Sequence, residues 1–108
     1  ILDATDNLPT REKIDHYAKQ TKTPWIYASV EEFNGQVCFF DHASFQVFNV
    51  SVHKPGGIAA PIVMHIAALQ ANLALRYLAN LTVLKDKLYY LYFNNTGELI
   101  TQKFNMPT

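Results

Sequence analysis

The sequence contains little cysteine and no excess of charge of either sign. Cys38 is the only cysteine, which excludes an internal disulfide and a zinc site built from several cysteines of this chain. Nine basic and nine acidic residues give a formal net charge of zero. This balance removes the general electrostatic attraction on which nucleic-acid binders and proteins of anionic membranes rely. We therefore expect no nucleic-acid partner, no membrane partner and a reducing, cytoplasmic setting.

Long apolar runs and phosphate-binding motifs are also missing. The most apolar segment, residues 58–81, is interrupted by His65, Gln70, Asn72 and Arg76, so it is not predicted to span a membrane. Neither a G-x-G-x-x-G nor a Walker motif occurs in the chain. The sequence opens on apolar residues with no basic segment before them, which is not typical of a signal peptide. From this opening we expect the sequence to start in the middle of a domain.

What is present predicts a folded α/β domain. Hydrophobic residues make up 49% of the 108 residues, enough for one buried core. The patterns first predict the end of a buried strand at residues 1–2, running into a polar turn, and a helix over 9–22. They then predict strands over 25–30, 35–40 and 45–52, a long helix over 60–79, and a hairpin of strands 87–93 and 99–104. The segment Phe33-Asn34-Gly35 predicts the turn of the first hairpin, because an Asn-Gly pair is a strong hairpin signal. The many alanines of the long helix predict close contact on more than one side.

Two carboxylates follow the first strand end, at Asp3 and Asp6. Carboxylates at the carboxyl edge of a parallel strand can hold hydrated magnesium or orient a nucleotide. The alternative is that Asp6 and Asn7 simply cap the next helix, and the spacing alone favours capping.

The other chemistry-bearing residues give no site by pattern. The four histidines, His16, His42, His53 and His65, lack the spacing of metal ligands. Cys38 sits in a strand pattern beside two phenylalanines, which favours a buried, inert thiol over a nucleophile.

The segment Leu2–Arg11 resembles the D-x-T-D-N-x-x-x-R motif of the ThiF/MoeB/HesA family, the bacterial relatives of ubiquitin-activating enzymes. Further pieces resemble the family in register: Pro24–Ser29, Asn34–Val37, Gly57–Pro61 and Ala68-Leu69-Gln70-Ala71. Together they cover essentially the whole chain.

The resemblance implies the C-terminal part of a Rossmann-like fold, with a mixed sheet, a long helix and a C-terminal hairpin. It implies use of ATP and magnesium to adenylate the C-terminal glycine of a ubiquitin-like sulfur carrier protein, by a homodimer. Asp6 matches the aspartate that helps to hold magnesium-ATP and supports adenylation. Asn7 and Arg11 match the next motif positions, where we expect support of the Asp6 loop and of the nucleotide edge. The resemblance thus favours a site role for Asp6 over capping.

The departures from the family define further expectations. The glycine-rich loop, arginine and lysine that precede the aspartate motif in the family are missing. We therefore expect residues 1–108 to be one C-terminal half, inactive without a nucleotide-binding half. The two C-x-x-C pairs that bind zinc in many members are missing too, so no zinc ligands are expected. The family's nucleophilic cysteine would fall near His53, which makes thioester chemistry there doubtful.

Two other interpretations stay open at this point. The shortened segment 41–55 fits a non-catalytic relative that serves as a dimerisation or carrier-binding module. A third possibility is an unrelated α/β domain that binds a small ligand.

Overall fold

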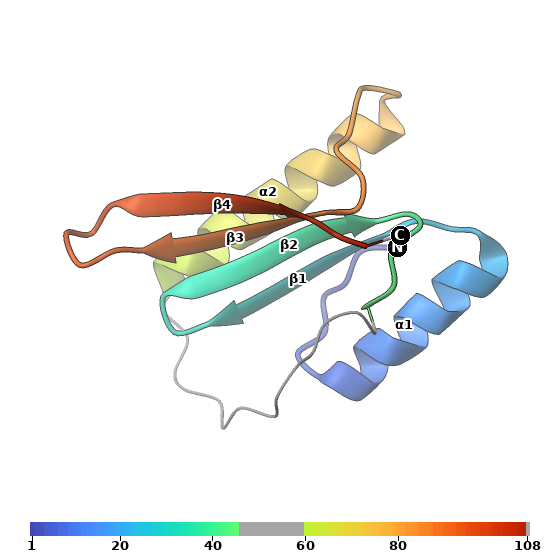
Figure 1. Cartoon of the computed structure of the whole chain (residues 1–108), viewed down its shortest axis with the longest axis horizontal. Helices are drawn as coiled ribbons and strands as arrows, with labels where there is room; N and C mark the ends of the chain where they lie inside the picture. The colour runs from blue at the N-terminus through green and yellow to red at the C-terminus, as the bar shows by residue number, and fades with distance from the viewer. Residues whose placement is uncertain (46–59, 108) are drawn as a thin grey trace.

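Four strands form one sheet in the computed structural model, which describes residues 1–45 and 60–107 (Figure 1). The order is β1-β2-β3-β4, and each strand is antiparallel to its neighbour. The bounds are β1 Trp25–Glu31, β2 Asn34–Phe40, β3 Lys87–Phe93 and β4 Leu99–Asn105. At the outer edge of β1, Leu2 forms a parallel bridge with Ile26. The sheet is therefore mixed and ends in a hairpin, which confirms the expected fold class.

Helix α1 (Leu8–Thr21) connects the first strand end to β1. Its start follows from local sequence, because the Asn7 side chain accepts a hydrogen bond from the Thr10 backbone N–H and Pro9 occupies the first turn. Its end follows from Lys22, which is left-handed with φ 54° and donates its N–H back to the last turn.

The two helices lie on opposite faces of the sheet (Figure 1). Alternation along the strands sends Ile26 and Val37 to the face covered by α2 (Ala60–Leu78), and Trp25 and Cys38 to the face of α1. On the α2 face the helix contributes Ile62, Ile66 and Leu73. On the α1 face, Trp25 stacks on Phe40 with ring centroids 4.9 Å apart.

Within the described residues, α2 buries one side only. Its opposite side is apolar but exposed, with Met64, Leu75 and Leu78 at 72%, 68% and 78% relative exposure. The expectation of close contact on more than one side is therefore not met by these residues. Apolar side chains on two opposite sides of a helix are typical of one buried on both sides.

The first hairpin forms as expected, but its turn lies elsewhere. Glu31 pairs with Asn34, so the loop is Glu32-Phe33, and Glu32 adopts the required positive φ of 50°. The predicted turn Phe33-Asn34-Gly35 was therefore displaced: Phe33 lies in the loop, but Asn34 and Gly35 lie inside β2. The expected strand over 45–52 falls, after Phe45, outside the described residues.

Residues 41–45, which follow β2, are hydrogen-bonded both to α1 and to the loop before β3. The Asp86 carboxylate accepts hydrogen bonds from the backbone N–H groups of Asp41, His42 and Ala43, at 2.9 to 3.1 Å. From α1, Lys19 donates to the Ala43 carbonyl and Asp15 accepts from the Ser44 hydroxyl. The chain is therefore held up to Phe45 by side chains from α1 and from the loop before β3.

Candidate functional site

The candidate site begins where the first strand leaves the sheet. The Ile26 N–H donates to the Ile1 carbonyl at 2.8 Å, and the Asp3 N–H donates to the Ile26 carbonyl at 2.9 Å. These two bonds form the parallel bridge. After Asp3 the chain turns away from β1 and enters the loop that carries Asp6. The first strand thus ends, as predicted, in a polar turn at a parallel edge. The prediction that this strand end is buried was wrong for the described residues, because Ile1 and Leu2 are 43% and 55% exposed.

Asp3 is the buried carboxylate of the pair, with a side chain at 0% relative exposure. One of its oxygens accepts from the Thr5 backbone N–H at 2.8 Å and from the Thr5 hydroxyl at 2.6 Å. The other accepts from Arg11 Nε at 2.8 Å. Asp3 therefore stabilises the loop, and its side chain has no exposed surface at which to meet a metal ion.

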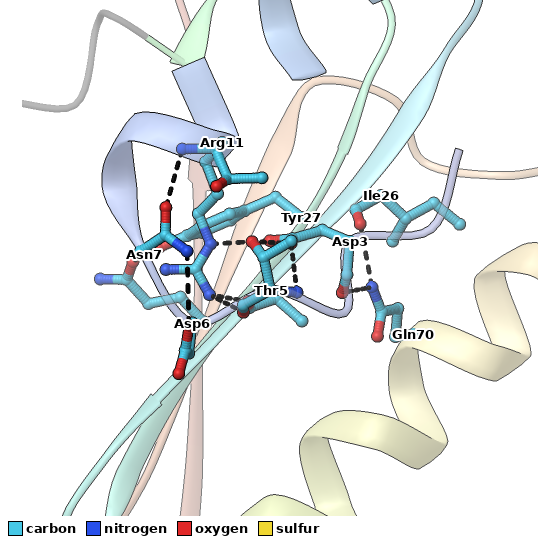
Figure 2. Close-up of polar contacts among 11 residues, drawn as sticks. Asp3, Thr5, Asp6, Asn7, Arg11, Ile26, Tyr27 and Gln70 are labelled. Carbon is cyan, nitrogen blue, oxygen red and sulfur yellow. Dashed lines mark hydrogen bonds and ion pairs between the residues drawn. The ribbon is translucent and has the colours of Figure 1, made fainter. Parts of the chain in front are cut away.

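Arg11 supports the same loop from α1, with its side chain at 7% relative exposure. Its Nη2 donates to the carbonyls of Thr5 and Ala28, each at 2.8 Å. Its guanidinium carbon lies 5.2 Å from the centre of the Tyr27 ring, a cation–π distance. Figure 2 shows this guanidinium between the loop and β1. Arg11 therefore ties the base of the Asp6 loop to the sheet.

Asp6 and Asn7 take different roles. Asn7 caps α1 through its Oδ1, so the capping alternative is correct for Asn7. Asp6 does not cap: it is exposed, and its Oδ1 lies 3.4 Å from Asn7 Nδ2. The Asp6 carboxylate is therefore open to solvent beside the fixed start of a helix, where a ligand can reach it.

Gln70 of α2 is a member of the site that the sequence did not assign. Its Nε2 donates to the carbonyls of Asp3 and Ile26, each at 2.9 Å (Figure 2). The signal available in the sequence was a glutamine inside an apolar helix, within the Leu69-Gln70-Ala71 piece. The two motif pieces, far apart in sequence, thus meet at Asp3.

The other candidates stay outside this site. Cys38 is fully buried, as predicted, and burial raises the pKa of its thiol to about 12. Across residues 1–45 and 60–107, no three His, Cys, Asp or Glu side chains lie close enough together to hold a metal ion. His53 lies outside the described residues. In the same ranges, no helix combines the length and apolarity needed to cross a membrane.

The fold of this chain is similar to that of solved structures. MccB from E. coli, solved with MccA-N7isoAsn, matches 98% of this chain with a TM-score of 0.73 and 12% identity. PaaA matches 91% with a TM-score of 0.67 and 14% identity. The chain spans about a third of their length, 37% of MccB and 33% of PaaA. At these identities the likeness establishes a shared fold.

Comparison with sequences gives the family. No curated protein matches the chain. The family model described as ThiF family matches residues 1–108, the full length of the sequence. This match confirms the resemblance carried by the Asp3–Arg11 motif and by the Gln70 piece. The chain belongs to the ThiF family.

Proposed function

We propose that this chain is part of an ATP-dependent adenylyltransferase in which Asp6 helps to hold magnesium-ATP. The proposal rests on the different environments of the two carboxylates, Asp3 and Asp6. Asp3 is buried and neutralised by Arg11, whereas Asp6 is exposed at the edge where a parallel strand ends. In open α/β sheets, ligands bind at this edge.

The residues present fit a magnesium-bound nucleotide. Magnesium prefers oxygen ligands and usually keeps several waters, so one exposed carboxylate is a suitable contribution from the protein. When bound, the ion neutralises charge that develops on the phosphates during transfer. Asn7 fixes the helix start next to Asp6, and Arg11 holds the loop to the sheet. We propose that these two residues orient Asp6 and lie near the edge of the bound nucleotide.

The proposed substrate is the C-terminal carboxylate of a ubiquitin-like sulfur carrier protein. In adenylation, a carboxylate oxygen of the carrier bonds to the α-phosphorus of ATP, and the bond to pyrophosphate breaks. MccB, which has a similar fold, was solved together with MccA. This pairing supports a peptide or protein as the substrate. We propose a protein partner of this kind for the present chain.

We propose that the groups that bind the triphosphate of ATP lie outside these 108 residues. The sequence holds no glycine-rich phosphate loop, and backbone N–H groups and cationic side chains are what normally cradle a triphosphate. Residues 1–108 are then one C-terminal half of the catalytic domain. We expect them to show no micromolar ATP affinity by themselves.

The test is ATP–pyrophosphate exchange by the full-length protein with a panel of ubiquitin-like carriers. Asp6→Asn is expected to abolish exchange because it removes the charge that faces the metal. Glu12→Gln makes the matched change at an exposed acid of α1 and should leave exchange unchanged. Exchange by Asp6→Asn at the rate of the parent protein would refute the role of Asp6.

A second candidate, a non-catalytic dimerisation or carrier-binding module, is favoured by the exposed apolar side of α2. This stripe consists of Ala60, Met64, Ala67, Ala68, Ala71, Leu75 and Leu78, at helical spacing opposite the core. We propose that it contributes to a homodimer. Sedimentation of the full-length protein should show a dimer that Leu75→Glu dissociates, whereas Glu12→Gln should not. A dimer that shows no exchange with any carrier would select the non-catalytic candidate.

A further inference from the structure

The parallel pairing between residues 1–3 and β1 stops after a single bridge. In a continuing parallel ladder, the Asp3 carbonyl would accept from the Ala28 N–H, and the Thr5 N–H would donate to the Ala28 carbonyl. Side chains take the place of the ladder for three of these four groups. The Thr5 N–H donates to the Asp3 carboxylate, and the Ala28 carbonyl accepts from Arg11 Nη2, both at 2.8 Å. The Asp3 carbonyl accepts from Gln70 Nε2 at 2.9 Å.

Gln70 differs from Arg11 in that it bonds a backbone carbonyl of each strand at the bridge itself, on Asp3 and on Ile26. A glutamine amide nitrogen carries two hydrogens, and here it donates to the carbonyls of Asp3 and Ile26. It comes from α2, on the face of the sheet opposite to α1, which supplies Arg11. The point where the strands separate is therefore held from both faces.

We infer that Gln70 is a positioning residue for Asp6. By occupying the Asp3 carbonyl, it prevents the strand from continuing along β1 and directs the chain into the loop. The loop then runs from a fixed Asp3 to a fixed helix cap at Asn7, with Asp6 exposed between them. Gln70 acts through the backbone, without touching the nucleotide. This inference rests on the proposed function, since it assigns Gln70 to the reaction through Asp6.

The main variant for the test is Gln70→Met, which keeps the side-chain length and removes both donors. Gln20→Met makes the same change at an exposed position of α1 and is the matched control. Gln70→Lys is the rescue, because its ammonium group again offers donors to both carbonyls. If Gln70→Met proves too unstable to assay, Gln70→Asn takes its place, since its shorter amide reaches at most one of the carbonyls.

The first measurement is the magnesium concentration that gives half-maximal ATP–pyrophosphate exchange, in the full-length protein well below its unfolding temperature. Gln70→Met should raise this concentration about tenfold, equivalent to about 1.4 kcal/mol. Gln70→Lys should recover most of the loss, and Gln20→Met should match the parent protein. A lower melting temperature with unchanged magnesium dependence would overturn the inference, because it would show a role in stability alone.

The second measurement is amide hydrogen exchange at Asp3 and Thr5, which does not depend on activity. Both amides are hydrogen-bonded in the structure, and Gln70→Met should accelerate their exchange about tenfold relative to Gln20→Met. If the parent protein shows no pyrophosphate exchange, the proposed function fails, and this measurement still decides whether Gln70 holds the loop. Unchanged protection of both amides would overturn the inference regardless of the kinetics.

Discussion

Gly35 of β2 lies so close beneath Ile66 of α2 that any larger residue at position 35 would collide with it. A Cβ added at Gly35 would be 2.4 Å from Cγ1 and 2.6 Å from Cδ1 of Ile66, and 3.1 Å from the Ser29 carbonyl oxygen. Such distances are shorter than van der Waals contact. The missing side chain therefore sets how closely α2 packs on the sheet, and α2 carries Gln70 to the Asp3 loop.

Gly35→Ala is expected to destabilise the protein by about 1–3 kcal/mol, the usual cost of overpacking a core. The loss should be smaller in an Ile66→Ala background, which removes the two colliding atoms. Urea unfolding of the four proteins in this cycle measures the coupling. Equal losses in both backgrounds would show that the contact with Ile66 does not determine the effect.

Gly35 also explains why the turn was misplaced from sequence. An Asn-Gly pair is a strong turn signal, but glycine in a strand also marks the close approach of another element. The sequence pattern does not say which of these applies, because Ile66 is thirty-one positions away. The turn instead formed at Glu32-Phe33, which carries no glycine.

The site was predictable in part. The helix cap at Asn7 followed from local sequence, and the family motif singled out Asp6. Spacing did not separate Asp3 from Asp6, because the difference depends on where Arg11 folds back. The role of Gln70 depends on contact between α2 and the first strand, which no local pattern contains.

Removing one partner of the buried Asp3–Arg11 ion pair is expected to destabilise the protein strongly. Arg11→Met would leave the Asp3 carboxylate buried without its partner, which typically costs about 3–5 kcal/mol. Asp3→Asn together with Arg11→Met should cost less than the sum of the two single changes. Lys13→Met, at an exposed position of α1, is the matched control for urea unfolding. Additive losses would show that the two side chains are not coupled.

Cys38 is expected to be unreactive in the native protein. Burial, with the nearby Asp86 charge, raises the pKa of its thiol to about 12, and the side chain is fully covered. Since the thiolate is the reactive form, labelling at pH 8 by a thiol reagent should be slow and should require unfolding. Labelling of the protein unfolded in urea is the control, because it shows that the reagent is active and that the exposed thiol reacts. Rapid labelling of the native protein would contradict this arrangement.

The Asp86 carboxylate is expected to make stability fall at low pH. Burial alone would raise its pKa, but the backbone N–H groups of Asp41, Ala43 and His42 outweigh burial and lower the pKa below its ordinary value of 3.8. A carboxyl whose pKa is lower in the folded state stabilises fully above its unfolded pKa. This stabilisation is lost as the pH falls through the folded value, below 3.8. The measurement is the free energy of unfolding from pH 7 to pH 2.

The matched variant for this titration is Asp86→Asn. Asparagine also tolerates the left-handed backbone at this position, where φ is 55°, so the change mainly removes charge. It should lower stability at pH 7 by about 1 kcal/mol or more, the scale of hydrogen bonds to a charged group. The difference from the parent protein should shrink as the pH falls below the unfolded pKa, because the parent carboxyl is then protonated too. Asp41→Asn removes a neighbouring charge that does not bind these N–H groups, and it should leave most of the acid-dependent difference in place. A constant difference between Asp86→Asn and the parent down to pH 2 would show that the Asp86 charge does not stabilise this segment.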